Sequence, residues 1–223
     1  MSKCAPHIGP DVANQDQCPT AQTVTGLVDF SPWYGLPLGT SPMTIGTNDS
    51  INDALALAND GDTINVAAGN YEEQVHVTAN DLTITGAGVG ATFVDAPADM
   101  PLFFTTAEDN YPIVFVDGAS GTALSGMTVD GQGNGALNYR FVGLGLHNAD
   151  GAYSDLHVTR VRNEPLNGTQ HGVGLYVIND DAAARAVTFT DVSVDDTQKN
   201  AAVFDGDGLT VEALRLACTG NGP

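Results

Sequence analysis

The sequence predicts an all-β protein that folds as a right-handed parallel β-helix, a solenoid of stacked coils. Of its 223 residues 26 are glycine, and Asp greatly outnumbers Glu, which favours turns over helix surfaces. Short segments alternate apolar and polar residues, as strands with one buried face do. Whole blocks of this pattern recur along the chain, which favours a solenoid over an antiparallel β-sandwich, the competing architecture.

The clearest recurrence has an offset of 31 residues. It matches Leu156–Val161 with Val187–Val192, Val142–Leu144 with Val173–Leu175, and Asn148 with Asn179. Further copies are Leu82–Thr85, Met127–Asp130 and Leu209–Leu214. We expect stacking to form two interior ladders, one of Leu82, Met127, Leu156, Val187 and Leu209, the other of Ile84, Val129, Val158, Phe189 and Val211.

The chain before the repeats divides at about residue 47. Residues 1–47 contain six prolines and are expected to form an irregular arm, and residues 48–223 are expected to form the solenoid. A short helix should begin after Ser50, whose side chain can accept from the amide of Asp53. Its apolar stripe, which we expect to close the core of the first coil, is Ile51, Ala54, Leu55 and Ala58. A strand at Thr63–Val66 and a turn at Gly69–Tyr71 should follow.

The stretch from Ser50 to Tyr71 resembles the opening of pectin-lyase-like β-helix proteins. In that family a short helix precedes the first coil and a turn like Gly61–Ile64 leads into the first strand, with a later step like Thr83–Gly86. The resemblance implies the fold and is nearly silent on activity. Val28–Trp33 resembles the closing segment of β-helix repeats in large bacterial surface proteins. That second resemblance implies that residues 1–47 end a preceding unit, that residues 48–223 begin a new β-helix, and that the protein is secreted or at the cell surface.

The charge is strongly negative, with 27 acidic residues against seven Lys and Arg and a formal net charge of −20. This argues against binding to nucleic acid and to anionic membranes. No stretch approaches the roughly 20 apolar residues of a membrane helix. The acids either hold calcium or keep the surface soluble. Cys4 and Cys18 can close a disulfide loop, and together with Cys218 they lack the spacing of a zinc site.

The outward positions of the aligned strands are rich in threonine. The expected columns are Thr83, Thr128, His157, Thr188 and Thr210, followed by Thr85, Asp130, Thr159, Thr190 and Glu212. Threonine is also simply a good exposed strand residue. As a carbohydrate-binding face, these columns make Thr188, Thr190 and Thr159 the binding candidates, together with Arg140.

The best chemical constellation is Arg160 and Arg162 with His157 and His171. The family resemblance implies that such cations could serve β-elimination in a polysaccharide lyase, with a base and a counter-charge for the substrate. The alternative is a salt bridge between Arg160 and Asp191 of the next coil. The calcium candidates are Asp191, Asp195 and Asp196, with Asp205 and Asp207 in a turn that an ordinary Asp-Gly pair also explains.

The function predicted is therefore an extracellular β-helix module that presents a lateral surface to carbohydrate or another macromolecule, without a demonstrable catalytic set. The alternatives are a polysaccharide lyase or glycoside hydrolase of the same fold, and a structural spacer in a surface fibre. Leu209, Val211, Leu214 and Leu216 read as a complete apolar coil followed only by residues 217–223. We expect end-to-end association there, continuation into a longer β-helix, or cover by the arm.

Overall fold

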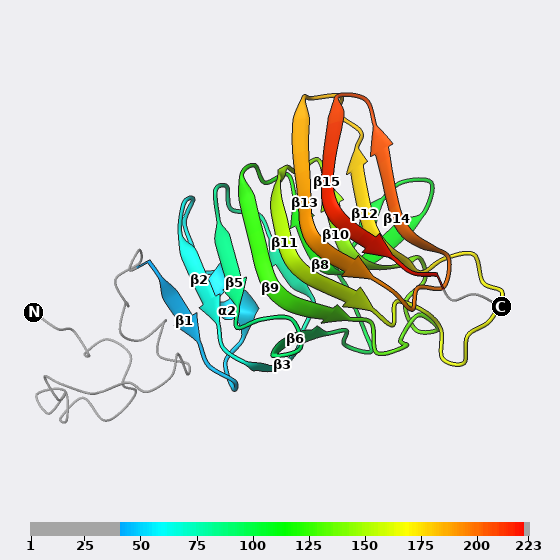
Figure 1. The fold of residues 1–223 in the computed structure, drawn as a ribbon, viewed down its shortest axis with the longest axis horizontal. Coiled ribbons are helices and arrows are strands. Elements are labelled where there is room, and N and C mark those ends of the chain that lie inside the picture. Colours follow the sequence, from blue (N-terminus) through cyan, green and yellow to red (C-terminus); the bar gives the residue numbers. More distant parts are fainter. Residues whose placement is uncertain (1–40, 221–223) are drawn as a thin grey trace, which may run out of the picture.

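The computed structural model describes residues 41–220, which form a stack of coils running from β1 to β15 (Figure 1). Strand pairing is parallel throughout these residues except for the small β7–β8 hairpin, and one isolated antiparallel bridge joins Asn134 to Asn163. Crossover connections between parallel strands of one sheet are right-handed almost without exception. The expected right-handed parallel β-helix is confirmed. The predictions for Cys4, Cys18 and Val28–Trp33 lie outside the described residues.

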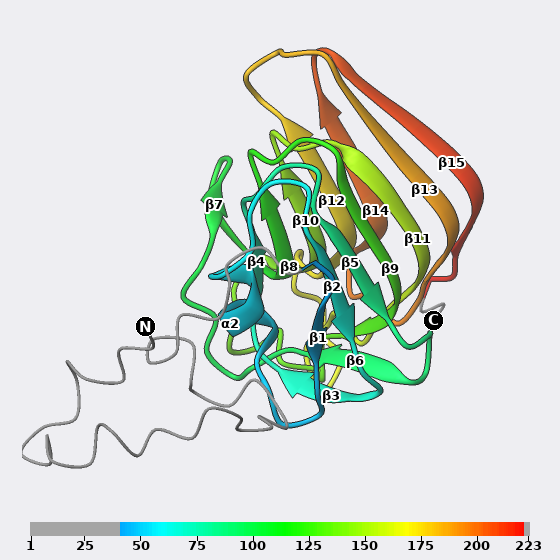
Figure 2. The same ribbon diagram turned by 90° about the vertical axis from the view of Figure 1, so that its left-hand side faces the viewer.

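Each full coil has three faces, and the long strands turn a corner between the first two. The first face contains β1 (Met43–Ile45), β2 (Thr63–Val66), β5 (Thr83–Gly86) and the first halves of β9 (Thr122–Asp130), β11 (Gly151–Thr159), β13 (Arg185–Val194) and β15 (Leu209–Cys218). The second face contains β3 (Gly69–Glu72), β6 (Thr92–Asp95) and the second halves of those four long strands. The third face contains β4 (Val75–Val77), β8 (Asp109–Asp117), β10 (Phe141–His147), β12 (Val173–Asn179) and β14 (Asn200–Gly206). Figure 2, seen from the side of β1, shows β3 and β6 between the two larger faces.

The corner between the first and second faces is built by one residue per coil with a left-handed backbone. Gly126, Asp155, Asp191 and Arg215 occupy it with φ between 50° and 69°. A Cβ at Gly126 would lie 2.7 Å from the Gly86 carbonyl oxygen, so glycine lets these two coils approach. The end of the second face repeats the device, with φ of 53° at Arg160 and 47° at Asp196.

These corners explain why the predicted register is wrong between β11 and β13, whereas the predicted neighbours Met127 and Leu156 of β9 and β11 are found. Leu156 pairs with Val192 rather than with Val187, an offset of 36 residues instead of 31. The second half of β11 and the first half of β13 have the same local pattern, an alternating strand that ends in a left-handed residue. The sequence match therefore aligned a strand segment of the second face with one of the first face. On the third face the offset of 31 is confirmed, because Val142 pairs with Val173 and Leu144 with Leu175.

The core fills the space between the three faces. One interior ladder is Ile84, Leu124, Tyr153 and Phe189, and another is Met127, Leu156 and Val192, all of them buried. Val187 faces Val211 in the next coil rather than Leu209, which pairs with Arg185. In the last coil the interior positions are more open, since Val211 and Leu216, which face Val187 and Val192, are only partly buried. Leu214 pairs with Thr190, outside the interior ladders, and is 51% exposed. End-to-end association there stays a prediction.

The first coil begins with a short helix, α2 (Ile51–Leu55), as expected. The Ser50 hydroxyl accepts from the Asp53 amide at 3.2 Å, and the Glu73 carboxylate accepts from the Ile51 amide at 2.7 Å. Ile51 and Ala54 are buried in the core, although whether the helix closes the coil stays a prediction.

Two neighbouring expectations meet a different outcome. Gly69–Glu72 is strand β3 rather than a turn, because it pairs with β6. Met43–Ile45, placed in the arm by sequence, pairs with β2. No helix among residues 41–220 is long and apolar enough to cross a membrane.

A hairpin covers part of the outer surface of the third face. It contains β7 (Phe104–Thr105), which pairs with the start of β8. Phe104 packs with Phe115 and Ile178 in a small apolar cluster outside the main core. A Cβ at Gly145 would lie 2.9 Å from Pro112 and 3.3 Å from Phe104, so glycine there leaves room for the hairpin.

Candidate functional site

A broad polar hollow, here called the acidic groove, lies on the second face where β3 and β6 end. Its volume is about 600 Å³, and six of its eight lining residues are polar or charged. The lining residues are Asn70, Glu72, Asp95, Ala96, Ala98, Gln132, Asn134 and Arg160. A hollow of this size and chemistry suits a ligand that forms many hydrogen bonds.

Acidic residues stack along one side of the groove. Glu72 pairs in register with Asp95, and Asp95 with Asp130. Neighbouring strands lie about 4.8 Å apart, so three like charges stand close together in successive coils. Asp95 is 8% exposed and Asp130 is 4% exposed. Without partners, these carboxylates would repel one another and lose hydration.

Each of the two buried acids has its own kind of partner. The Asp95 carboxylate accepts from the side-chain amides of Asn70 and Gln132, both at 2.8 Å. The Asp130 carboxylate accepts two hydrogen bonds from Arg160, one from Nε at 2.7 Å and one from a terminal nitrogen. The hydrogen bond to Asp130 is the main cause that raises the pKa of Arg160. Two adjacent carboxylates thus have different environments: Asp95, which lines the groove, lies among neutral amides, and Asp130, which is outside the lining, lies beside a cation.

Further along the second face, His157 and Thr159 both contact Asp195. The His157 Nε2 lies 3.0 Å from one carboxylate oxygen, and the Thr159 hydroxyl donates to the other at 2.5 Å. Desolvation by itself raises the pKa of Asp195, but the hydrogen bonds from Thr159 and His157 outweigh it and lower that pKa. The imidazole is therefore used to hold a carboxylate.

The second hollow, here called the cationic pocket, lies where the third face begins. It has a volume of about 130 Å³ and eleven lining residues, none of them acidic. They are Asn110, Arg140, Val142, Gln170, His171, Gly172, Val173, Tyr176, Lys199, Asn200 and Val203. The loops 131–140 and 160–172 serve both hollows, since they contribute Gln132 and Arg160 to the groove and Arg140 and His171 to the pocket.

The structure separates the four catalytic candidates. Arg160 lies in the acidic groove, and His171 lies in the cationic pocket. Arg162 is ion-paired with Asp196 at 2.8 Å and with Glu164 at 2.5 Å. The expected salt bridge from Arg160 to Asp191 is wrong, because the register brings Arg160 to Asp130 and leaves Asp191 to Arg215. No single site of the lyase kind unites these cations.

The binding candidates are also dispersed. Thr188 and Thr190 lie on the first face, where their neighbours in β11 are Ala152 and Ser154. Thr159 lies on the second face, and Arg140 lies just before the third. The predicted threonine columns hold only for two neighbour pairs, Thr128 with His157 and Asp130 with Thr159. Their other members were joined wrongly, because the columns combined positions from two faces.

The aspartates proposed for calcium stand apart as well. Asp191 is at the first corner, Asp195 and Asp196 end the second face, and Asp205 and Asp207 are exposed beside β14. Within residues 41–220 no three His, Cys, Asp or Glu side chains lie close enough to hold a metal ion together. Calcium binding stays a prediction.

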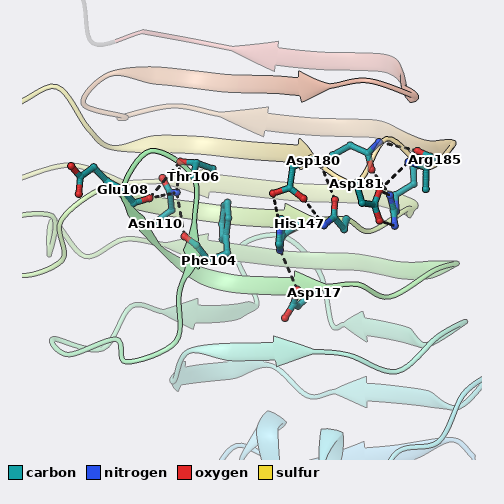
Figure 3. Close-up of polar contacts among 12 residues, drawn as sticks. Phe104, Thr106, Glu108, Asn110, Asp117, His147, Asp180, Asp181 and Arg185 are labelled. Atoms are coloured by element: carbon teal, nitrogen blue, oxygen red, sulfur yellow. Dashed lines mark hydrogen bonds and ion pairs between the residues drawn. The ribbon is translucent and has the colours of Figure 1, made fainter.

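Figure 3 shows a further polar arrangement, on the outer surface of the third face. The His147 ring lies between two carboxylates, with Nδ1 3.3 Å from Asp117 and Nε2 3.2 Å from Asp180. Hydrogen bonds from Asn148 and then from His147 lower the pKa of Asp180. The ring also stacks on Phe104, with centroids 5.2 Å apart. This arrangement ties the hairpin to the sheet.

Sequence analysis missed Asp95, Gln132 and Lys199. The sequence contained a signal for Asp95, because the dipeptides Val94-Asp95 and Val129-Asp130 end two strands that pair in the structure. The offset of 31 residues, extended back from Val142, places Arg140 level with His171. Lys199 had a fainter signal, since the last coil of the third face follows after only 27 residues.

Comparison with solved structures finds pectin methylesterases. One is a mutant in complex with a hexasaccharide, with 15% identity, a TM-score of 0.43, and coverage of 78% of this chain and 55% of that one. A second, in complex with another hexasaccharide, has 13% identity, and a third, from Erwinia chrysanthemi, has 14%; each has a TM-score of 0.43 and coverage of 71% and 56%. The chain therefore spans about half the length of these structures. No protein-family model matches the chain, and the comparison with curated proteins finds no match.

The three parallel faces, the left-handed corners and the continuous interior ladders define the class of this protein. It is a right-handed parallel β-helix.

Proposed function

We propose that this chain is an extracellular β-helix module that binds carbohydrate in the acidic groove. The observation that carries the proposal is a hollow of about 600 Å³ in which planar polar side chains already hold one another in place. Asn70 and Gln132 both contact Asp95, and Arg160 contacts Asp130, so their rotamers are constrained before any ligand arrives. Preorganised side chains lose less conformational entropy on binding.

The chemistry of the lining favours sugar hydroxyls. Each hydroxyl both donates and accepts a hydrogen bond, and the groove offers carboxylate and amide oxygens as acceptors next to amide and guanidinium donors. The stacked acids Glu72, Asp95 and Asp130 disfavour an anion at the same place. A glycan whose backbone is neutral where it crosses the groove fits this field best.

Binding to a panel of neutral oligosaccharides, measured by isothermal titration calorimetry, tests the proposal. We expect Asn70→Ala and Gln132→Ala each to weaken binding roughly tenfold, the effect of losing about one well-made hydrogen bond and its positioning of Asp95. Thr188→Ala, which removes a polar group from the first face, is the matched control and should leave binding unchanged. No saturable binding of any neutral oligosaccharide would contradict the proposal.

Hydrolysis of the bound glycan is the second candidate function. It is favoured by the pairing of Asp95 with Asp130, two nearly buried carboxylates in adjacent coils with unlike partners. Glycoside hydrolysis commonly needs one carboxylic acid and one carboxylate, and unlike environments are how a protein divides those roles. Here Asp130 lies beside the Arg160 guanidinium, and Asp95 accepts hydrogen bonds from two neutral amides.

Release of reducing ends from the same oligosaccharides separates the two functions. If the groove hydrolyses glycans, Asp95→Asn and Asp130→Asn should each lower the rate by at least a hundredfold, while the Asn70 and Gln132 variants lose mainly affinity. Binding without release of reducing ends would mean that the chain is a binding module and not a hydrolase.

A further inference from the structure

The cationic pocket is unusual because its two cations form no ion pair with a carboxylate among the described residues. Six of the seven Lys and Arg residues lie within the described residues. Four of them are ion-paired with carboxylates: Arg160, Arg162, Arg185 and Arg215. Arg140 and Lys199 have no ion pair with a carboxylate among residues 41–220, and both line this one pocket. In a chain with 27 acidic residues, two cations that stay together and unpaired leave a local positive field.

Arg140 is oriented by neutral groups. Its terminal nitrogen donates to the Thr106 hydroxyl at 3.2 Å and to the Glu108 carbonyl oxygen at 3.3 Å. These acceptors hold the guanidinium in the hairpin loop without cancelling its charge (Figure 3 shows Thr106 and Glu108 beside Asn110). A guanidinium has five donors in a fixed fork, so donors remain for a planar or tetrahedral oxyanion.

His171 adds a buried polar group to the same pocket. The residue is 7% exposed, and its Nδ1 has no hydrogen-bond partner among the described residues. Burial, and then the charge of Lys199, lower the pKa of His171, so the ring is neutral at pH 7. The Tyr139 ring meets the His171 ring edge-on at a centroid distance of 5.2 Å and is itself 58% exposed. Tyr139 packs on His171 without itself lining the pocket.

The size of the pocket sets the size of the group that fits. About 130 Å³ corresponds to roughly four water molecules at about 30 Å³ each. That space suits a carboxylate or sulfate group. We propose that the cationic pocket binds a single oxyanion, a carboxylate or sulfate group, between Arg140 and Lys199.

The experiment uses titration calorimetry at low salt with three probes: inorganic sulfate, glucuronate and neutral glucose. We expect sulfate and glucuronate to bind and glucose not to bind at this pocket, with affinity that falls as salt rises. Arg140→Gln and Lys199→Gln should each weaken anion binding at least about tenfold, as expected for the loss of a charge-assisted hydrogen bond. Tighter binding of glucuronate than of sulfate would identify the natural oxyanion as the carboxylate of a sugar acid. Tighter binding of sulfate would identify it as inorganic sulfate or the sulfate group of a larger ligand.

Arg215→Gln is the matched control, because it removes the same charge from an arginine at the first corner that is paired with Asp191. Anion binding should survive in that variant. Equal losses in Arg215→Gln and Arg140→Gln would show only a general effect of net charge and would overturn the proposal, as would unchanged binding in Arg140→Gln. Binding of neutral oligosaccharides in the acidic groove is read separately, so failure of either proposal leaves the other standing.

Discussion

The acidic groove and the cationic pocket share two loops but differ in how their arginines are paired. In the groove, Arg160 is hydrogen-bonded to the carboxylate of Asp130, a residue that is 4% exposed. In the pocket, Arg140 has only neutral hydrogen-bond partners. The two arginines share a left-handed backbone, with φ of 53° and 50°. The comparison teaches that in this protein an arginine's role depends on whether the register places a carboxylate opposite it.

Replacing each arginine by methionine should separate structure from binding most strongly. Arg160→Met leaves the Asp130 charge buried without its partner, and we expect it to cost about 1–3 kcal/mol of the free energy of unfolding. This is below the range for a fully buried pair because the Arg160 side chain is 43% exposed. Arg140→Met should cost less than about 1 kcal/mol, since it loses only hydrogen bonds to neutral acceptors. Urea unfolding followed by circular dichroism measures the free energy of unfolding of both variants. Because both arginines have a left-handed backbone, any backbone strain should affect the two variants equally. Equal costs would break the comparison.

Neutralising the two acids of the groove one at a time sharpens the account of their partners. Asp130→Asn should destabilise by about 1–2 kcal/mol, because it weakens the charged hydrogen bonds from Arg160. Asp95→Asn should change stability by less than about 1 kcal/mol, because the lost amide hydrogen bond is offset by relief of repulsion from Glu72 and Asp130. The same unfolding measurement at pH 7 checks this. A larger loss for Asp95→Asn than for Asp130→Asn would mean that the amides, rather than Arg160, hold the groove together.

The smallest expected effect is a pH dependence that comes from His171. Because burial and Lys199 lower its pKa in the folded state, the unfolded chain binds the proton more readily below the model-peptide pKa of 6.5. The neutral ring is fully compatible with the fold above that pH, and stability should fall as pH drops below it. The charged or titratable groups around the ring are Lys199, Arg140, Tyr139 and Tyr176.

Thermal unfolding at several pH values, compared with His171→Gln, checks this dependence. The stability advantage of the unmodified chain over the variant should shrink as pH falls. Added sulfate should restore part of it, since a bound anion gives the protonated ring a counter-charge. A pH profile that is unchanged in His171→Gln would rule out this residue as the cause.

The sequence alone determined the solenoid, because side-chain alternation and turn residues are local properties. It placed β2 at Thr63–Val66 and the hydroxyl of Ser50 on the Asp53 amide, and both are found. It also gave the offset of the third face, where the strand Val142–Leu144 has a near copy in Val173–Leu175. Each of these features depends on neighbours in the chain or on one unbroken repeat.

Only the tertiary structure decided which face follows which and which charges meet. Leu156–Arg160 and Val187–Asp191 have the same local pattern on different faces, so the sequence match shifted the stacking by five residues, from an offset of 36 to one of 31. Because of that shift, the sequence predicted a salt bridge from Arg160 to Asp191, whereas Arg160 is paired with Asp130. Coils of a β-helix differ in loop length, and the register between them is fixed by the packing of the whole interior. The partners of surface charges follow from that packing rather than from the local pattern.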